Sequence, residues 1–301
     1  MKTILKGCIA IAFASAAMGA QAGPFSLPGS PLKIKFENKE QLSSTGAIVA
    51  PSGASESNWG IAQITSIDTA NIISQLNFST ASPVFDNNNG QGQVMAMFYG
   101  TQFYQIDAGD GSFDSQNGFL DLYYFDGDND FDFANATPYP RWDDANDDTY
   151  TGLTDTGQFL VRLEFAPGVD PTDINVDVTG SVVPSAAGFS GDATWFADVV
   201  DVDGSGVIGD SAADGAWAAA LNGDWFTTAF GQRDLYGKSD YDYLSTWGDG
   251  TTSGDEGTSG NVVGAFSDDP ILAVAVPEPA SLALMGLSLL GLGFGKRRSK
   301  I

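Results

Sequence analysis

The fold is indicated most clearly by the segment QFLVRLEF, residues 158–165. In an extended chain successive side chains point to opposite faces, so Phe159, Val161 and Leu163 are expected to share one apolar face. Glu164 falls on the opposite face, where we expect it to point into solvent. This alternation of apolar and polar positions predicts a half-buried β-strand.

Other segments enriched in β-branched and aromatic residues are separated by turns rich in Asp, Asn, Gly, Ser and Pro. They are Leu32–Phe36, Trp59–Ile67, Gln93–Tyr99, Thr101–Ile106, Gly118–Phe125, Ile174–Val183, Ala193–Val200, Val262–Phe266 and Ile271–Val276. Short strands at this spacing predict an all-β protein, built as an antiparallel β-sandwich or jelly roll. We expect one domain over residues 23–276, although the loop-rich stretch 126–157 leaves open a division into two sheets or subdomains.

One short helix is expected over residues 211–222. Ser211 and Asp214 fit the spacing of a capping box, an alanine-rich stretch follows, and a glycine after it suits the C-terminal stop. We expect this helix to pack Trp217 and Leu221 against an edge of the sheets.

Acidic residues dominate the charge of the chain, which carries a formal net charge of −25. Between the two ends, residues 23–276 hold seven basic residues against 37 acidic ones, a balance of −30. A surface of this sign repels phosphate backbones, so nucleic acid is excluded as a partner. Of the 38 acidic residues, 32 are Asp and six are Glu, a bias that favours turns and divalent-metal loops over helices.

Two absences restrict the chemistry. The chain has no His, which excludes Ser-His-Asp and Cys-His catalysis and histidine zinc sites. Its one cysteine, Cys8, lies in the first 22 residues, so the body has neither a disulfide nor a thiol nucleophile. No catalytic or cofactor-binding residue is predicted, and we do not expect an enzyme.

The N-terminus has the form of a secretion signal over residues 1–22. A basic start is followed by an apolar run and then by Ala20 and Ala22, which frame a small-x-small cleavage site. We therefore expect signal peptidase to remove this segment, and Gly23 to begin the exported chain.

The C-terminus has three parts in a fixed order. The motif Pro277, Glu278 and Pro279 precedes a mostly apolar run over 280–295. The chain then ends in a basic cluster: Lys296, Arg297, Arg298 and Lys300. As a helix the apolar run would span roughly 24 Å, slightly less than a bilayer core of about 30 Å. The basic cluster is expected to stay cytoplasmic, which places the body outside.

This C-terminal arrangement, residues 277–301, resembles the PEP-CTERM sorting signal. The resemblance implies recognition by an exosortase, transient anchoring in the inner membrane through 280–295, and release to the cell surface or an exopolysaccharide matrix. A permanent single-span anchor is the competing interpretation. The resemblance is confined to the tail and identifies no subfamily for the body.

The first candidate calcium site is the loop that holds Asp126, Asp128, Asp130 and Asp132. Carboxylates at alternate positions of a loop can converge on one hard cation, and Ca²⁺ takes six to eight oxygens. Further aspartates between 143 and 148 are expected to complete the shell or to form a second one. The alternative is a solvated acidic loop without a cation.

The second candidate calcium site resembles the start of an EF-hand or dockerin loop. Its oxygen ligands at the first, third and fifth positions are Asp201, Asp203 and Ser205. The twelfth position is Ala212 where an acid belongs, so Asp210 or Asp214 would have to substitute. The alternative is a glycine-rich turn that leads into the following helix.

These observations favour a non-catalytic structural or adhesive protein of an exopolysaccharide matrix. A carbohydrate-binding module displayed in that matrix is the alternative, because exposed aromatic rings stack on sugars; Trp142, within the acidic loop, is the ring expected to be exposed. A polysaccharide-active enzyme comes third, because with so many aspartates a carboxylate pair can always be proposed.

Overall fold

The structure of the chain is a computed structural model. It describes residues 25–43, 48–49, 55–74, 77–106, 111–126, 131–136, 152–154, 156–185, 188–247, 249–253 and 261–274. The signal segment 1–22 and the tail 277–301 lie outside these residues.

Antiparallel strands make up most of the described chain. The strands of the main sheet are β1 (Pro31–Ser43), β4 (Asn58–Ser74), β5 (Asn77–Asp86), β6 (Gln93–Ile106), β7 (Ser112–Gln116), β8 (Phe119–Phe125), β9 (Gln158–Ala166), β10 (Val178–Ser185), β11 (Gly188–Val199), β14 (Leu235–Tyr243), β15 (Asp249–Ser253) and β16 (Asn261–Val274). Two small ribbons pair β2 (Ile48–Val49) with β3 (Ser55–Glu56) and β12 (Phe226–Thr228) with β13 (Gly231–Arg233). The short helices are η1 (Asn87–Asn89), α2 (Ala218–Leu221) and η3 (Ser245–Trp247).

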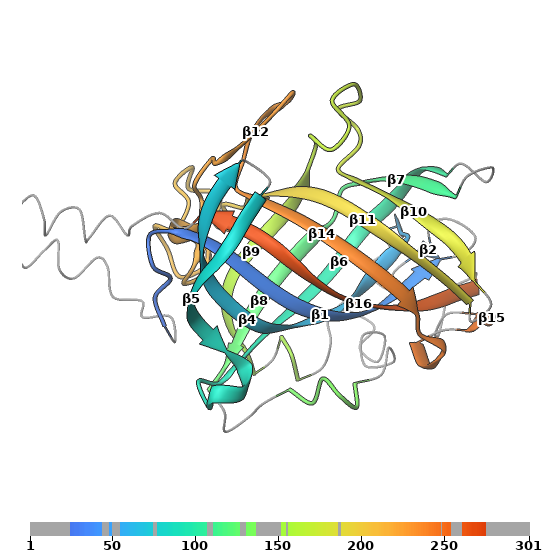
Figure 1. Cartoon of the computed structure of the whole chain (residues 1–301), viewed down its shortest axis with the longest axis horizontal. Helices are drawn as coiled ribbons and strands as arrows, with labels where there is room; N and C mark the ends of the chain where they lie inside the picture. The colour runs from blue at the N-terminus through green and yellow to red at the C-terminus, as the bar shows by residue number, and fades with distance from the viewer. Residues whose placement is uncertain are drawn as a thin grey trace, which may run out of the picture.

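The main sheet closes on itself. The order β6-β8-β9-β11-β14-β16-β1-β4 is completed by pairing of β4 with β6, so the strands wrap into a tilted cylinder (Figure 1). Two further strands continue the wall between β6 and β11. β7 pairs with β6, and β10 pairs with both β7 and β11. The predicted antiparallel β-rich fold is therefore present, but as one closed sheet and not as two stacked sheets.

The strands on either side of loop 126–157 belong to this same sheet. β8, which precedes the loop, pairs directly with β9, which follows it. The loop is thus an insertion between neighbouring strands of one wall, and the described strands do not divide there into two subdomains.

Alternate residues of the strands that close the cylinder point into it and form the main core. On β1 these are the buried Leu32, Ile34 and Phe36, and the pattern continues along the strand. Large aromatic rings lie over glycines of the neighbouring strand: a Cβ on Gly60 or Gly237 would overlap the side chain of Phe98 or Trp195, respectively. Glycine at these two positions therefore leaves room for the aromatic rings of the neighbouring strands.

One end of the cylinder is covered by the segment before β1 and by α2. Phe25 stacks on Phe85, with ring centroids 5.3 Å apart, and meets Trp217 edge-on at 5.2 Å. The indole nitrogen of Trp217 also donates a hydrogen bond to the Phe25 carbonyl, 3.2 Å away. Trp217 and Leu221 are buried in the main core, as predicted for the helix face.

The helix itself is shorter than predicted, because its expected cap is used elsewhere. α2 has four residues, and its N-cap, Trp217, makes no side-chain capping bond. Ser211 instead accepts a hydrogen bond from the backbone of Ala213, and Asp214 binds backbone groups of the preceding loop. The capping box predicted from Ser211 and Asp214 is therefore wrong.

A second apolar cluster covers the outside of the wall. It includes Met95, Tyr123 and Phe125 of the sheet together with Phe133 of the acidic loop. Phe159 packs there against Tyr123, with ring centroids 5.6 Å apart. Its expected place on the same face as Val161 and Leu163 is wrong, because a bulge between β8 and β9 shifts the alternation.

Candidate metal centre

The second predicted calcium loop connects β11 to α2 and folds back tightly. Gly204 and Gly206 have φ of 70° and 87°, a left-handed conformation that glycine adopts without strain. The turn aims two backbone N–H groups at the Asp201 carboxylate, which accepts hydrogen bonds from Gly204 at 2.9 Å and Gly206 at 2.6 Å. Asp203 accepts one from the backbone of Ser205 at 2.8 Å.

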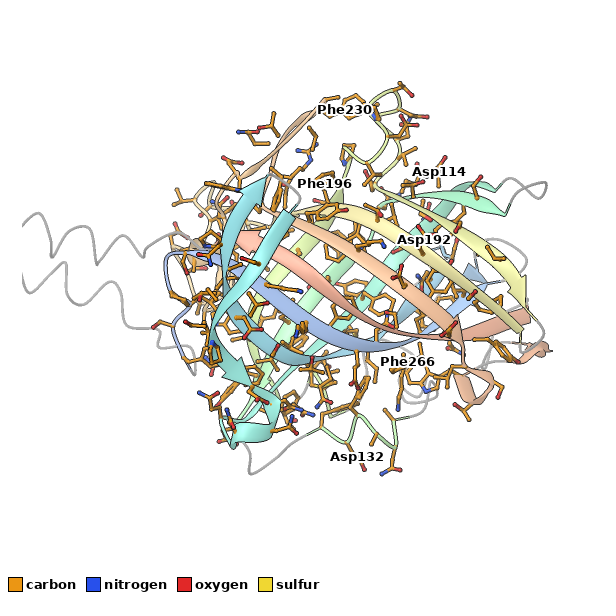
Figure 2. All side chains as sticks on the ribbon, viewed as in Figure 1. Asp114, Asp132, Asp192, Phe196, Phe230 and Phe266 are labelled. Atoms are coloured by element: carbon orange, nitrogen blue, oxygen red, sulfur yellow. The ribbon has the colours of Figure 1, made fainter. Side chains whose placement is uncertain are left out.

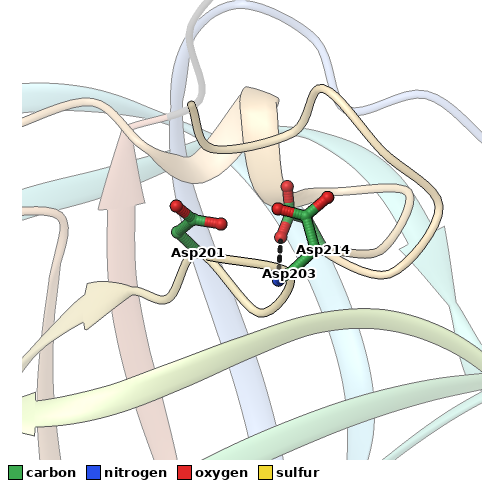
Figure 3. Close-up of side chains that lie close together, drawn as sticks. All are labelled: Asp201, Asp203 and Asp214. Atoms are coloured by element: carbon green, nitrogen blue, oxygen red, sulfur yellow. Dashed lines mark hydrogen bonds between the residues drawn. The ribbon is translucent and has the colours of Figure 1, made fainter. Parts of the chain in front are cut away.

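Asp214 closes the loop from its far end. This carboxylate is fully buried and accepts hydrogen bonds from the backbone of Val202 at 2.7 Å and of Gly209 at 2.9 Å. One carboxylate oxygen from each of Asp201, Asp203 and Asp214 lies within 4.8 Å of the other two (Figure 3). The three acids therefore form one compact cluster, even though they are thirteen positions apart at most.

The chemistry of this cluster suits a hard cation. Its ligands are all carboxylate oxygens, and each keeps a lone pair beyond those used by backbone N–H groups. A hydrogen bond from the Ser211 hydroxyl holds the pKa of Asp203 below its ordinary value, so this acid stays charged in weakly acidic solution. The three Asp can thus bind a metal ion, although the ligand atoms alone do not identify which one.

The structure gathers part of the set predicted for this loop. Asp201 and Asp203 lie together as expected, and Asp214 takes the place of the missing acid at the twelfth position. Asp210 and Ser205 instead form a neighbouring pair, in which the Ser205 hydroxyl lies 3.1 Å and 3.2 Å from the two Asp210 oxygens.

The first predicted calcium loop falls largely outside the described residues, which leave out Asp128 and Asp130. Asp126 and Asp132 are described, and both are exposed. Asp132 accepts hydrogen bonds from the backbone and side-chain nitrogens of Asn135, at 3.2 Å and 2.9 Å, which lower its pKa. Figure 2 shows Asp132 on the loop that runs below the cylinder.

This acidic loop is fastened to the wall by specific contacts. The side chain of Gln93 exchanges two hydrogen bonds with the backbone of Phe131, at 2.8 Å and 2.9 Å. Lys39 donates to the carbonyls of Phe133 and Ala134 and lies 4.7 Å from the centre of the Phe133 ring. The described part of the loop thus covers an apolar area of the outer wall.

An ion pair on the outer wall, between a buried carboxylate and a partly exposed arginine, was not predicted. Asp121, which is 1% exposed, accepts two hydrogen bonds from Arg162, at 2.7 Å and 2.8 Å. The hydroxyl of Tyr99 lies 3.2 Å from the same carboxylate. Sequence reasoning could have found the pair, because Asp121 interrupts an otherwise apolar strand and needs a cation beside it.

One aromatic ring of the described residues is well exposed, and it is not the one singled out in the sequence. Trp142, the ring expected to be exposed, lies outside the described residues. Trp225 is 40% exposed and follows Asp224, a non-glycine residue with φ of 50°. A flat ring beside a carboxylate at a turn is an arrangement that can stack on a sugar.

None of the helices described by the structure is long and apolar enough to cross a membrane. The search of curated proteins found no match, and neither did the search of solved structures. A family model does match residues 275–298, and it describes the PEP-CTERM protein-sorting motif. The tail therefore carries a PEP-CTERM sorting signal, as its three-part sequence predicts, and the chain is an exported protein sorted by an exosortase.

Proposed function

We propose that the chain is a non-catalytic structural or adhesive component of an exopolysaccharide matrix at the cell surface. The observation that carries the proposal is the sorting motif over residues 275–298, joined to a strongly acidic body. Signal peptidase would remove residues 1–22, the apolar run 280–295 would hold the chain briefly in the inner membrane, and exosortase would then release it.

The use of acids within the body supports a structural role. Asp170, Asp173 and Asp177 each accept a hydrogen bond from a nearby backbone N–H, at 2.7 Å, 2.9 Å and 2.6 Å. Asp234 does the same for Val199 and Asp224. Carboxylates that accept hydrogen bonds from turns and strand ends organise a loop-rich exported domain. The remaining acids give the domain a negative surface that cations can bridge to acidic polymers.

Calcium is the cation we propose for the cluster of Asp201, Asp203 and Asp214. Extracellular proteins commonly bind it through carboxylate-rich loops with dissociation constants of about 10⁻⁴–10⁻³ M. The cluster would then stabilise the loop that leads into α2, and α2 in turn covers one end of the cylinder.

Processing can be tested by intact mass of the protein recovered from the surface of its native cells. We expect a chain that begins at Gly23 and ends near Pro277–Pro279. A chain that still carries Lys296–Ile301 would instead indicate a permanent anchor.

The matrix role can be tested by co-sedimentation of the processed protein with exopolysaccharide purified from the same cells. We expect co-sedimentation in millimolar calcium and its loss in chelator, with magnesium at matched ionic strength as the control. Failure to sediment with the polymer under any of these conditions would contradict a matrix-bound role.

The second candidate function, a displayed carbohydrate-binding module, is favoured by the exposed Trp225. Binding on a glycan array that is lost in Trp225→Ala or Trp142→Ala would support the module. Turnover of a polysaccharide, lost when one specific Asp pair is replaced, would instead make the protein an enzyme.

A further inference from the structure

The closed sheet contains a cavity of about 80 Å³. Side chains of β1, β4, β6, β8, β11 and β14 line it, together with residues of β7, β9 and β10. The lining is largely apolar, and its larger members include Phe36, Phe98, Leu122, Trp195 and Tyr241. An apolar interior of this kind can hold the body of a small organic molecule.

Glu40 is the one acid among the residues that line this cavity. It lies on the inner face of β1, opposite Gly60 of β4 and Ala265 of β16, and only 5% of its surface is exposed. Within the described part of the chain, its carboxylate has one hydrogen-bond partner, the side-chain nitrogen of Asn58 at 3.0 Å. The lining includes neither Lys nor Arg, so a charged Glu40 has no counter-ion there.

A second acceptor, beside Glu40, has no hydrogen-bond donor among the described residues. The side-chain oxygen of Asn58 is buried, and the described residues offer it no hydrogen-bond partner. Nearby polar groups are already engaged: the Tyr241 hydroxyl donates to the Ser181 carbonyl at 2.7 Å, and the Asn38 oxygen accepts from Ser267. The cavity therefore presents a carboxylate with a single donor and an amide oxygen with none, and such buried acceptors cost free energy until they are paired.

We propose that this cavity is a binding site for a small primary ammonium ion with a short aliphatic body. The ammonium group has three N–H donors and a positive charge. It can therefore donate hydrogen bonds to the Glu40 carboxylate and the Asn58 oxygen together, and form an ion pair with Glu40. The aliphatic body meets the apolar lining. An engineered apolar cavity of roughly 150 Å³ takes up benzene, so the ligand here is smaller than an aromatic ring.

The electrostatic setting favours a cation of this kind. Burial raises the pKa of Glu40 to about 7, because little in the fold stabilises its charged form. Asn58 and Tyr241 are the neighbouring groups that interact with it, and neither carries a positive charge. A bound ammonium would supply the missing counter-charge, while the acidic surface attracts cations and repels anions.

The test is calorimetric titration of the purified full-length chain with n-butylammonium, 1-butanol and butyrate at pH 8 in 0.15 M salt. The three probes share a chain length but differ in charge, so they separate charge recognition from apolar filling. We expect n-butylammonium to bind at least tenfold more tightly than 1-butanol, and butyrate not to bind. Equal binding of the ammonium ion and the alcohol, or no binding of either at millimolar concentration, would overturn the proposal.

Variants locate the binding inside the cylinder. Glu40→Gln keeps the size of the side chain and removes its charge, so it should lose at least tenfold in n-butylammonium affinity. Glu164→Gln is the matched control, because Glu164 is exposed on β9. Ala62→Leu should fill the cavity and abolish uptake of both the ammonium ion and the alcohol, with folding checked by melting curves. Binding that survives Glu40→Gln would place the cation elsewhere on the acidic surface and overturn the proposal.

Discussion

The interior of the sheet and the loop between β11 and α2 each bury a carboxylate, but they surround it differently. Asp214 in the loop accepts hydrogen bonds from backbone N–H groups at both of its oxygens. Glu40 in the interior accepts a single bond from an amide. The first carboxylate is part of the framework of its loop, whereas the second leaves acceptor capacity open to a proton or a ligand.

The outer wall adds a third arrangement, in which Asp121 is paired with Arg162 by two short hydrogen bonds. The fold thus contains three buried acids with different donors. Asp214 has backbone N–H groups, Asp121 has a charged side chain, and Glu40 has one side-chain amide. Burial alone therefore does not define a functional acid. What matters is how much of its hydrogen-bonding capacity the fold already uses.

The largest expected effect comes from removing the charged partner of Asp121. Arg162→Met leaves this carboxylate buried and uncompensated, which should lower the free energy of unfolding by about 3–5 kcal/mol. Chemical denaturation measures the change. The double variant Asp121→Leu/Arg162→Met should recover much of the loss, because no uncompensated charge then remains buried in the wall. A loss below about 1 kcal/mol in the single variant would show that the pair contributes little.

The second effect has the opposite sign and depends on pH. Since the folded pKa of Glu40 is raised to about 7, the folded state binds more protons than the unfolded state between about pH 4.5 and 7. Stability from this group is therefore present at low pH and lost as pH rises. Glu40→Gln should match the wild type near pH 4 and exceed it by on the order of 3 kcal/mol at pH 8.

Denaturation curves of both proteins across this pH range provide the measurement. The pKa values of Asp177 and Asp198 are also raised by burial, each to about 6, but these acids are unchanged in the variant and cancel in the difference. A difference that does not vary with pH would show that Glu40 keeps its ordinary pKa.

The strands that could be predicted from the sequence are those whose own apolar and β-branched side chains favour an extended chain. The segments 93–99 and 101–106 were predicted separately, yet they form one strand that passes through Gly100 at φ of 78°. β14 was missed because LYGKSDYDY holds charged residues and a glycine, and its place is fixed by pairing with β11 and β16. Closure of the sheet was also missed, because it depends on pairing between β4 and β6 and not on either sequence alone.

The same division holds for the candidate sites. Asp201 and Asp203 could be predicted because their spacing is local, whereas the arrival of Asp214 depends on how the loop returns. Glu40 left a signal that was not used, since it shares the inner face of β1 with Ile34 and Phe36 at a period of two. The N-terminal signal and the calcium identity stay predictions, while the sorting motif is confirmed.

The third effect concerns the framework role of Asp214. Asp214→Asn replaces one acceptor oxygen by an NH₂ group that faces backbone donors, so it should lower the free energy of unfolding by about 1–3 kcal/mol in calcium-free buffer. Asp210→Asn is the matched control, because Asp210 is exposed and its carboxylate is hydrogen-bonded by the Ser205 hydroxyl and not by buried backbone groups; it should change stability by less than about 0.5 kcal/mol. Equal losses in the two variants would contradict a special role for Asp214.

The smallest expected effect is stabilisation by calcium. A ligand that binds only the folded state adds RT ln(1 + [L]/Kd), which at millimolar calcium and the usual extracellular affinities is about 0.4–1.4 kcal/mol per site. Melting curves with calcium against magnesium at matched ionic strength separate binding from screening, which also stabilises so acidic a protein.

Two sets of variants assign the calcium effect to a loop. Asp203→Asn should remove it if the ion binds with Asp201 and Asp214, while Asp128→Asn/Asp130→Asn should remove it if the ion binds in the 126–132 loop. Asp173→Asn, in an exposed turn with a similar hydrogen bond, should leave it unchanged. Because three carboxylates already converge in the loop between β11 and α2, we expect Asp203→Asn to cause the larger loss. Equal stabilisation by the two ions in every variant would reduce both loops to solvated acidic turns.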